Sequence, residues 1–162
     1  MAAPKDPIQE KRLLRLTIAH YRQQDVSERD FHRWVTEGHA ALSAKLHARN
    51  GVEGFSVFFN PKSFRDFTAQ LNMQRGSPWV VRDYDVHVEY LFRDMSTLYK
   101  GLQDPEFQVL VAQEGPWVSP IHAEVSLGWV ETYISEGQVV NIGADGKPSY
   151  PGFEELSVPP AV

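Results

Sequence analysis

Two stretches of the chain alternate apolar and polar residues with the period of two that a half-buried strand requires. At residues 84–92, Tyr84 and Tyr90 fall on the apolar face and His87 on the polar face. At residues 13–21, His20 continues the apolar face. Two further apolar stretches, one ended by Asn-Pro and one by Glu-Gly, are interpreted as strands. The pattern predicts strands at residues 13–21, 55–59, 84–92 and 123–134.

Apolar residues recur with the helical period of 3.6 between these strands. The first helix is expected to begin at Ser27, a suitable N-cap, and to end at Asn50-Gly51. Its apolar stripe consists of Phe31, Val35, Leu42 and Leu46. A short helix is expected at residues 64–73, and a longer one at 95–111 is expected to bend at its internal Asp-Pro step.

The order of these elements is β-α-β-(short α)-β-α-β with a small hairpin after the last strand. This order predicts an α+β fold, a ferredoxin-like βαββαβ sheet with helices on one face. Such a sheet leaves its other face uncovered, and we expect a homodimer because a second subunit would cover it. A single domain is expected over residues 1–162, with a core at about 12–135 and a C-terminal hairpin and extended proline-rich tail at 136–162.

Composition narrows the chemistry that the chain can perform. It has six histidines, no cysteine and a net charge of −5. The absence of cysteine excludes thiol nucleophiles, Cys-ligated metals and disulfides, and the negative charge argues against nucleic acid as a partner. No apolar run approaches the ~20 residues that span a bilayer, and no signal peptide is recognisable, so we expect a cytoplasmic protein without membrane contact.

Several segments resemble one known family. Residues 31–40, Phe-His-Arg-Trp-Val-Thr-Glu-Gly-His-Ala, are similar to a signature of EthD-domain proteins. Residues 102–107, Leu-Gln-Asp-Pro-Glu-Phe, followed by Glu114 and Trp117, are similar to a stretch before the last strand of that family. Residues 125–131 resemble fungal members from aromatic polyketide pathways. The resemblance covers about residues 12–135.

This resemblance implies a dimeric α+β barrel that acts without a cofactor on a small aromatic polyketide-like substrate. Decarboxylases of anthraquinone-type carboxylic acids, dehydratases and cyclases all share these features, and the fold does not choose among them. Two departures stand out in this sequence. Ala41 replaces the usual proline after His-Ala, and residues 64–82 form a long insertion that suggests a lid or an added wall of the pocket.

The histidines are the candidate acid–base groups, because small shifts move an imidazole pKa across neutrality. His39 shares the apolar side of the first helix and matches the family signature, so we expect it to be catalytic, although a buried structural histidine would show the same pattern. His20 falls in the same sheet–helix layer. His122 and His87 are further candidates, but they are also explained as a loop residue and as part of a solvated face.

The remaining histidines, His32 and His47, are interpreted as structural. A metal site is not expected, since Asp85, His87 and Glu89 are the best candidate ligands and plain alternation on a polar strand face explains them. A planar substrate would be held by aromatic and apolar side chains, or these would simply pack in the core. The candidates for substrate binding are Tyr84, Tyr90, Trp34, Val35, Phe58 and Trp79.

The sequence thus predicts a cofactor-independent lyase, with decarboxylation of an aromatic polyketide acid as the leading hypothesis. His39 would protonate the substrate, while His20 or His122 would stabilise the developing enolate. Cyclisation or dehydration would need the same groups. A non-catalytic dimer that binds a small aromatic molecule is the alternative from another class of protein.

Overall fold

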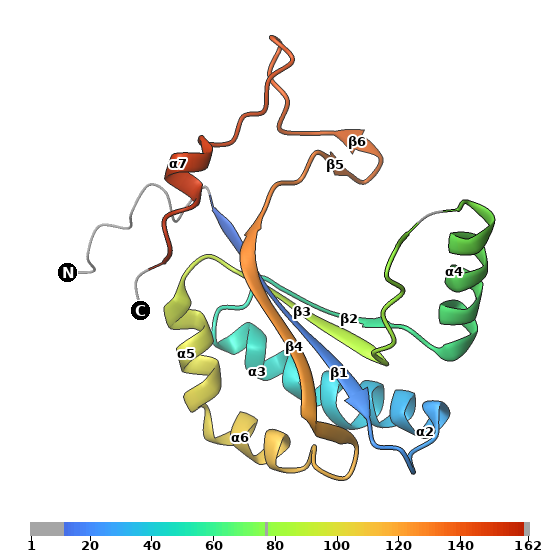
Figure 1. The fold of residues 1–162 in the computed structure, drawn as a ribbon. Helices are drawn as coiled ribbons and strands as arrows, with labels where there is room; N and C mark the ends of the chain where they lie inside the picture. Colours follow the sequence, from blue (N-terminus) through green and yellow to red (C-terminus); the bar gives the residue numbers. More distant parts are fainter. Residues whose placement is uncertain (1–11, 77, 161–162) are drawn as a thin grey trace.

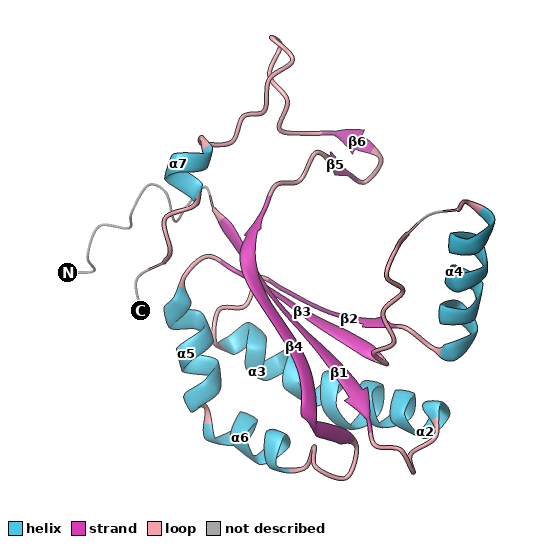
Figure 2. Cartoon of the chain, viewed as in Figure 1, coloured by secondary structure: helices cyan, strands magenta, loops and turns pink. Residues whose placement is uncertain are grey.

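The computed structural model describes residues 12–76 and 78–160. A four-stranded sheet carries most of the helices on one face, while a short hairpin and two further helices stand apart from that layer (Figures 1 and 2). The elements in chain order are β1 (Leu13–Arg22), α2 (Glu28–Arg33), the π-helix η1 (Trp34–Ala40), α3 (Ala41–Arg49), β2 (Gly54–Phe59), α4 (Lys62–Gln74), β3 (Val86–Phe92), α5 (Met95–Gln103), α6 (Pro105–Ala112), β4 (Val118–Val130), β5 (Ile134–Ser135), β6 (Gln138–Val139) and α7 (Phe153–Leu156).

The sheet is antiparallel throughout, with the strand order β2-β3-β1-β4. The central strand β1 pairs with β3 on one side and β4 on the other. Leu14 lies opposite Phe92 and Trp129 at one end of the sheet, and His20 lies opposite Val86 at the other. The ferredoxin-like fold predicted from the order of elements is therefore confirmed.

The apolar core lies between the sheet and helices α2, α3, α5 and α6, which Figure 2 shows on the same side of the strands. Two buried clusters occupy this layer: Leu14, Leu16 and Phe92, with Met95 and Leu98 of α5 packed against them, and Phe31, Val35 and Val86, with Trp34 and Trp117 packed against them. Alternation along β1 and β3 explains this arrangement, because every second side chain points into the layer.

The opposite face of the sheet, which we call the outer face, carries polar pairs between strands. Arg15 lies 3.3 Å from Glu89, and the hydroxyls of Thr17 and Ser126 are 2.5 Å apart. These pairs satisfy the polar groups of neighbouring strands without a helix above them.

The long helical segment after β1 begins as predicted. The Ser27 hydroxyl accepts a hydrogen bond from the Asp30 N–H at 3.1 Å and so caps α2. The segment also ends as predicted, with Asn50 as the C-cap of α3 and Gly51 at a φ of 96°.

The middle of this segment is not a regular α-helix. In η1 the N–H of Ala41 donates to the carbonyl of Thr36, five residues earlier, which is the π-helical pattern. The wider turn rotates α3 relative to a 3.6-residue extrapolation. As a result Leu42 is 53% exposed, while Ser43 and His47 are buried. The predicted apolar stripe is wrong at Leu42 for this reason.

Helix α4 confirms the short helix predicted at residues 64–73, but it packs on no part of the core. None of its residues is buried. Figure 1 shows it projecting on the side of the sheet away from α2, α3, α5 and α6.

The C-terminal region differs from the prediction in two respects. Strand β4 runs from Val118 to Val130 rather than over 123–134, and the hairpin β5–β6 is separate from the main sheet. The tail is not simply extended, since α7 buries Leu156, whose carbonyl accepts a hydrogen bond from Arg12 at 3.0 Å. Within residues 12–76 and 78–160, the structure has no helix whose length and apolar character would suit a membrane span.

Candidate active site

A cavity of about 370 Å³ lies between the sheet and helices α3, α5 and α6. Its walls are mainly apolar, with Leu16 and Ile18 from β1, Phe92 from β3 and Phe107 from α6. Its size and lining are typical of small-molecule sites. The polar side chains that line it are His20, His47, Tyr90, Thr97 and Glu114. Among the described residues, none of those lining the cavity is Lys or Arg.

Glu114 and His39 are two titratable side chains that lie in contact at this cavity. Glu114 follows α6 and lines the cavity, and its Oε1 lies 3.5 Å from Nε2 of His39. The two side chains are only 26% and 16% exposed. Burial raises the pKa of Glu114 and lowers the pKa of His39. Burial therefore shifts the two pKa values toward each other.

The π-helix η1 determines where His39 lies. The Trp34 ring is stacked on Trp117, with centroids 5.4 Å apart, and lies 5.5 Å from the imidazole of His39. Gly38 allows this approach, because a Cβ at this position would lie 3.2 Å from Cδ1 of Trp34. π-helical turns are often found at functional sites, and here the turn brings His39 against Glu114.

His20 and His47 line the cavity from opposite layers, β1 and α3. Burial, and secondarily the nearby His39, lower the pKa of His20 and lower that of His47 to about 4, so both are neutral at pH 7. Nδ1 of His20 and Nε2 of His47 are buried without a hydrogen-bond partner in the described part of the chain. Such atoms leave a hydrogen-bonding capacity unmet among the described residues.

Aromatic rings hold His47 in place. The rings of Phe55, Tyr90 and Phe107 surround its imidazole with centroids 4.9 to 5.0 Å away. The Tyr90 hydroxyl belongs to the same site, and burial raises the pKa of Tyr90 strongly, so it remains protonated over the usual pH range.

Lowering the pH from neutral to about 4 is expected to reduce the free energy of unfolding. The folded-state pKa values of His20, His39 and His47 lie below the ordinary value of 6.5, so the unfolded chain binds more protons in this range and stability falls with pH. Urea denaturation at several pH values measures this slope. The His47→Leu variant should show a shallower slope, and His32→Leu, at an exposed position, should follow the wild type. Equal slopes for His47→Leu and the wild type would contradict a buried, neutral His47.

The structure brings only part of the predicted site together. His20 and Tyr90 line the cavity, and His39 contacts it through Glu114. Strand β4 contains His122, but its side chain lies outside the described part of the structure. His87 stacks on Tyr84, with centroids 5.7 Å apart, and does not line the cavity.

Five of the predicted substrate contacts also lie elsewhere. Val35 is 5% exposed in the core cluster near α2, where Trp34 packs against it. Phe58, Trp79 and Tyr84 line a different hollow, beside α4. These five side chains therefore do not line the same cavity as Tyr90. None of the described residues at 62–76 and 78–85 lines the cavity, so α4 is not a wall of that cavity within the described structure of this chain.

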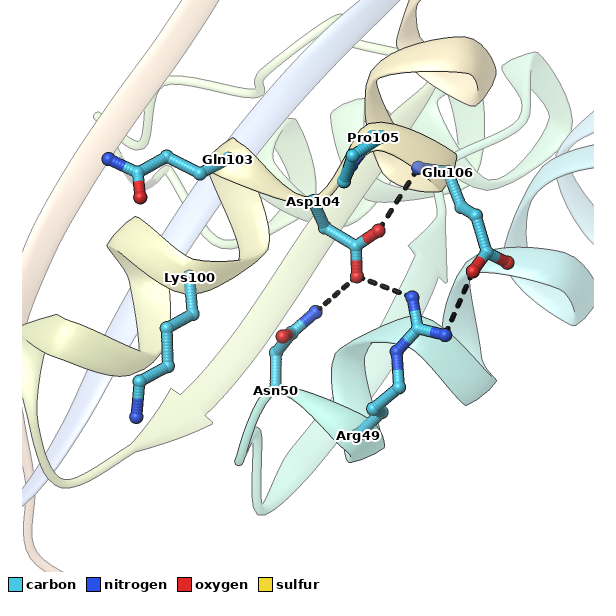
Figure 3. Close-up of a pocket in the computed structure, with 7 residues that line it drawn as sticks. All are labelled: Arg49, Asn50, Lys100, Gln103, Asp104, Pro105 and Glu106. Atoms are coloured by element: carbon cyan, nitrogen blue, oxygen red, sulfur yellow. Dashed lines mark hydrogen bonds and ion pairs between the residues drawn. The ribbon is translucent and has the colours of Figure 1, made fainter.

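A second hollow, of about 420 Å³, lies at the junction of α3, α5 and α6 (Figure 3). Arg49, Asp104 and Glu106, three of its charged groups, pair with one another. Arg49 donates to Asp104 at 2.6 Å and to Glu106 at 2.9 Å, and Asn50 donates to Asp104 at 2.8 Å. These hydrogen bonds lower the pKa of Asp104 to about 2. Because Asp104 also caps α6, we interpret this network as a structural tie between helices.

The predicted alternation of Asp85, His87 and Glu89 does not form a metal site. Asp85 pairs with Arg22 at 3.1 Å and Glu89 with Arg15 at 3.3 Å. Across residues 12–76 and 78–160, no group of three or more His, Asp or Glu side chains is arranged to hold a metal ion.

The chain is an α+β protein of ferredoxin-like fold, with a Glu–His pair at an apolar cavity. Comparison with known proteins identifies its family. The EthD domain matches residues 23–121. The chain belongs to the EthD domain family, which confirms the resemblance seen in its sequence.

Three fungal relatives illustrate the chemistry found among similar proteins. A putative oxygenase from Aspergillus terreus is 38% identical over 146 residues, covering 90% of this chain and 91% of the relative. A dehydratase from Pestalotiopsis fici is 24% identical and covers 82% of this chain and 96% of the relative. A decarboxylase from Aspergillus novofumigatus is 25% identical and covers 82% and 87%.

Solved structures agree on the fold. A crystal structure of a dimeric ferredoxin-like protein of unknown function from Thermobifida fusca superposes with a TM-score of 0.51 at 10% identity. It covers 79% of this chain and 100% of that chain.

Proposed function

We propose that this chain is a cofactor-independent lyase of secondary metabolism that decarboxylates an aromatic polyketide acid. The observation that carries the proposal is the Glu114–His39 pair, whose groups are 3.5 Å apart and have converging pKa values at the wall of an apolar cavity. The decarboxylase and dehydratase among its relatives support chemistry of this class.

The pair would supply the proton that decarboxylation requires. With one proton between them, Glu114 faces the substrate and His39 stabilises the carboxylate that forms when Glu114 gives the proton up. The substrate carbon takes this proton, its bond to the carboxylate carbon breaks, and the bonding electrons remain on the ring as CO2 leaves. A proton from water then restores the pair.

The cavity favours this step in two further ways. Its apolar walls, without a lining Lys or Arg, would desolvate the substrate carboxylate and so favour its loss. The imidazoles of His20 and His47, which line the cavity, would hydrogen-bond carbonyl or hydroxyl groups of the substrate and stabilise the enolate that develops.

Other reactions use the same groups. Dehydration or cyclisation requires one group that removes a proton and one that returns it, and the Glu114–His39 pair can do both. Oxygenation is a second candidate because the Aspergillus terreus relative, at 38% identity, is named a putative oxygenase.

Incubation with a panel of aromatic polyketide acids, followed by mass spectrometry and CO2 detection, tests the proposal. We expect a product that has lost CO2. A product that has lost water, or that has gained an oxygen atom under air but not under nitrogen, would replace decarboxylation by the corresponding alternative. Tight binding without any product would identify a carrier instead.

We also propose that the protein acts as a homodimer. The outer face of the sheet lies on the side away from α2, α3, α5 and α6 (Figure 2), and the Thermobifida fusca structure with this fold is described as dimeric. A second copy placed against the outer face would shield it from solvent.

A further inference from the structure

Helix α4 presents an apolar stripe that no other described part of the chain covers. Phe64, Phe67 and Leu71 recur at i, i+3 and i+7, so they share one side of the helix. Phe64 and Phe67 are 67% and 65% exposed. Exposed aromatic residues grouped in this way are unusual on a monomer and indicate an interaction surface.

This stripe belongs to a larger apolar region on the outer side of the sheet. Figure 1 shows α4 and the β5–β6 hairpin both projecting on the side opposite α2, α3, α5 and α6. Ile134 and Val139 of that hairpin are 68% and 72% exposed. Phe58, Trp79 and Val80, which line a hollow beside α4, are 48 to 78% exposed.

The region also contains a recess. A hollow of about 370 Å³ lies beside α4, and Phe58, Trp79 and Tyr84 form its aromatic walls. The guanidinium of Arg75 lies 4.7 Å from the Trp79 ring and helps to hold that ring in place.

We infer that the α4 stripe is an arm that inserts into the recess beside α4 of a second copy of this chain. A symmetric dimer uses the same patch on both subunits. If that patch carries both a projection and a recess, the projection of each subunit can enter the recess of the other. A partner of another kind would need only the projection or only the recess to bind. The inference rests on the homodimer proposed above and specifies which elements hold it together.

The exposed area is sufficient for such an interface. The stripe, the residues around the recess and the two hairpin side chains together expose on the order of 800 Å², about what each partner contributes to a standard-size interface. A membrane surface is the less favoured occupant, because the net charge of −5 would be repelled by anionic lipid.

Measurement of mass in solution by light scattering and sedimentation tests the arm. The Phe64→Glu, Phe67→Glu double variant should raise the dimer dissociation constant by about 100-fold or more, because charges would be buried at the centre of the contact. Ala69→Glu is the matched control. It is exposed on the opposite side of the same helix and should leave the dimer unchanged. Circular dichroism confirms that each variant is folded.

The possible outcomes separate the arm from the dimer itself. A double variant that dimerises like the wild type overturns the arm. If the Ser126→Arg variant of the outer face is then monomeric, the homodimer forms through the outer face and does not need the arm. A monomeric wild type overturns both proposals. A wild type that stays monomeric but co-sediments with phosphatidylcholine vesicles through Phe64 and Phe67 would identify a membrane surface instead.

Discussion

The His39→Ala enzyme is expected to turn its substrate over about 10²-fold or more slowly than the wild type. Removal of the imidazole leaves Glu114 without the group that stabilises its carboxylate, so the proton is harder to release to the substrate carbon. Single-turnover kinetics with a substrate from the acid panel measure the effect. Substrate binding should be less affected, because His39 is not among the residues that line the cavity.

Two further variants make the result specific to the pair. Glu114→Gln should lose a similar factor, and the double variant should lose little more than either single one, since the two groups act as a unit. His32→Ala, at an exposed position of the same helical segment, should keep wild-type turnover. Wild-type turnover in the His39→Ala enzyme would remove the pair from the mechanism, and additive losses would mean that the two residues act separately.

Most of the fold could be predicted because its determinants are local. The alternation over residues 84–92 and the Ser27 cap each depend on a few neighbouring residues, and the order of elements then selects a known topology. The length of β4 could not be read in the same way. Its start at Val118 depends on pairing with Arg22 of β1, a contact far away in the sequence.

The residues of the proposed site could be predicted only in part. His39 and His20 were recognisable because each falls on an apolar face of a regular pattern. His47 was interpreted as structural because it lies near the end of the helix, and its place in the cavity lining could not be predicted, because η1 shifts the phase of α3. Glu114 lies in a turn after α6, where no periodicity exists. The family stretch that contains it was the only sequence signal.

Two aromatic candidates, Tyr84 and Phe58, lie outside the cavity for reasons of strand geometry. Tyr84 and Tyr90 fall on one face if alternation continues through residue 84, but β3 begins at Val86. Residues before Val86 lie outside the strand, so their side chains need not alternate between its two faces. The Tyr84 ring lies beside α4 instead. Phe58 is on the outer face because its strand neighbours Val57 and Phe59 point toward the helices.

Replacing Phe92 by Ala is expected to have the largest effect on stability, a loss of about 3–5 kcal/mol in the free energy of unfolding. Phe92 is 1% exposed, and it packs with Leu14 and Leu16 at the centre of one core cluster. Its register partner Leu14 holds β1 and β3 together, so little relaxation can fill the space. Urea denaturation would show a lower midpoint at an unchanged slope.

The Val109→Ala variant is the control, because Val109 is 58% exposed on α6 and should change stability by no more than about 0.5 kcal/mol.

The register also separates Phe92 from the acid–base groups: it lies at the Leu14 end of the sheet, and His20 lies at the other end. Folded Phe92→Ala protein should therefore keep the chemical step while binding substrate less tightly, since its ring lines the cavity. A loss of the chemical step without a loss of stability would mean that Phe92 supports the Glu114–His39 pair rather than the core.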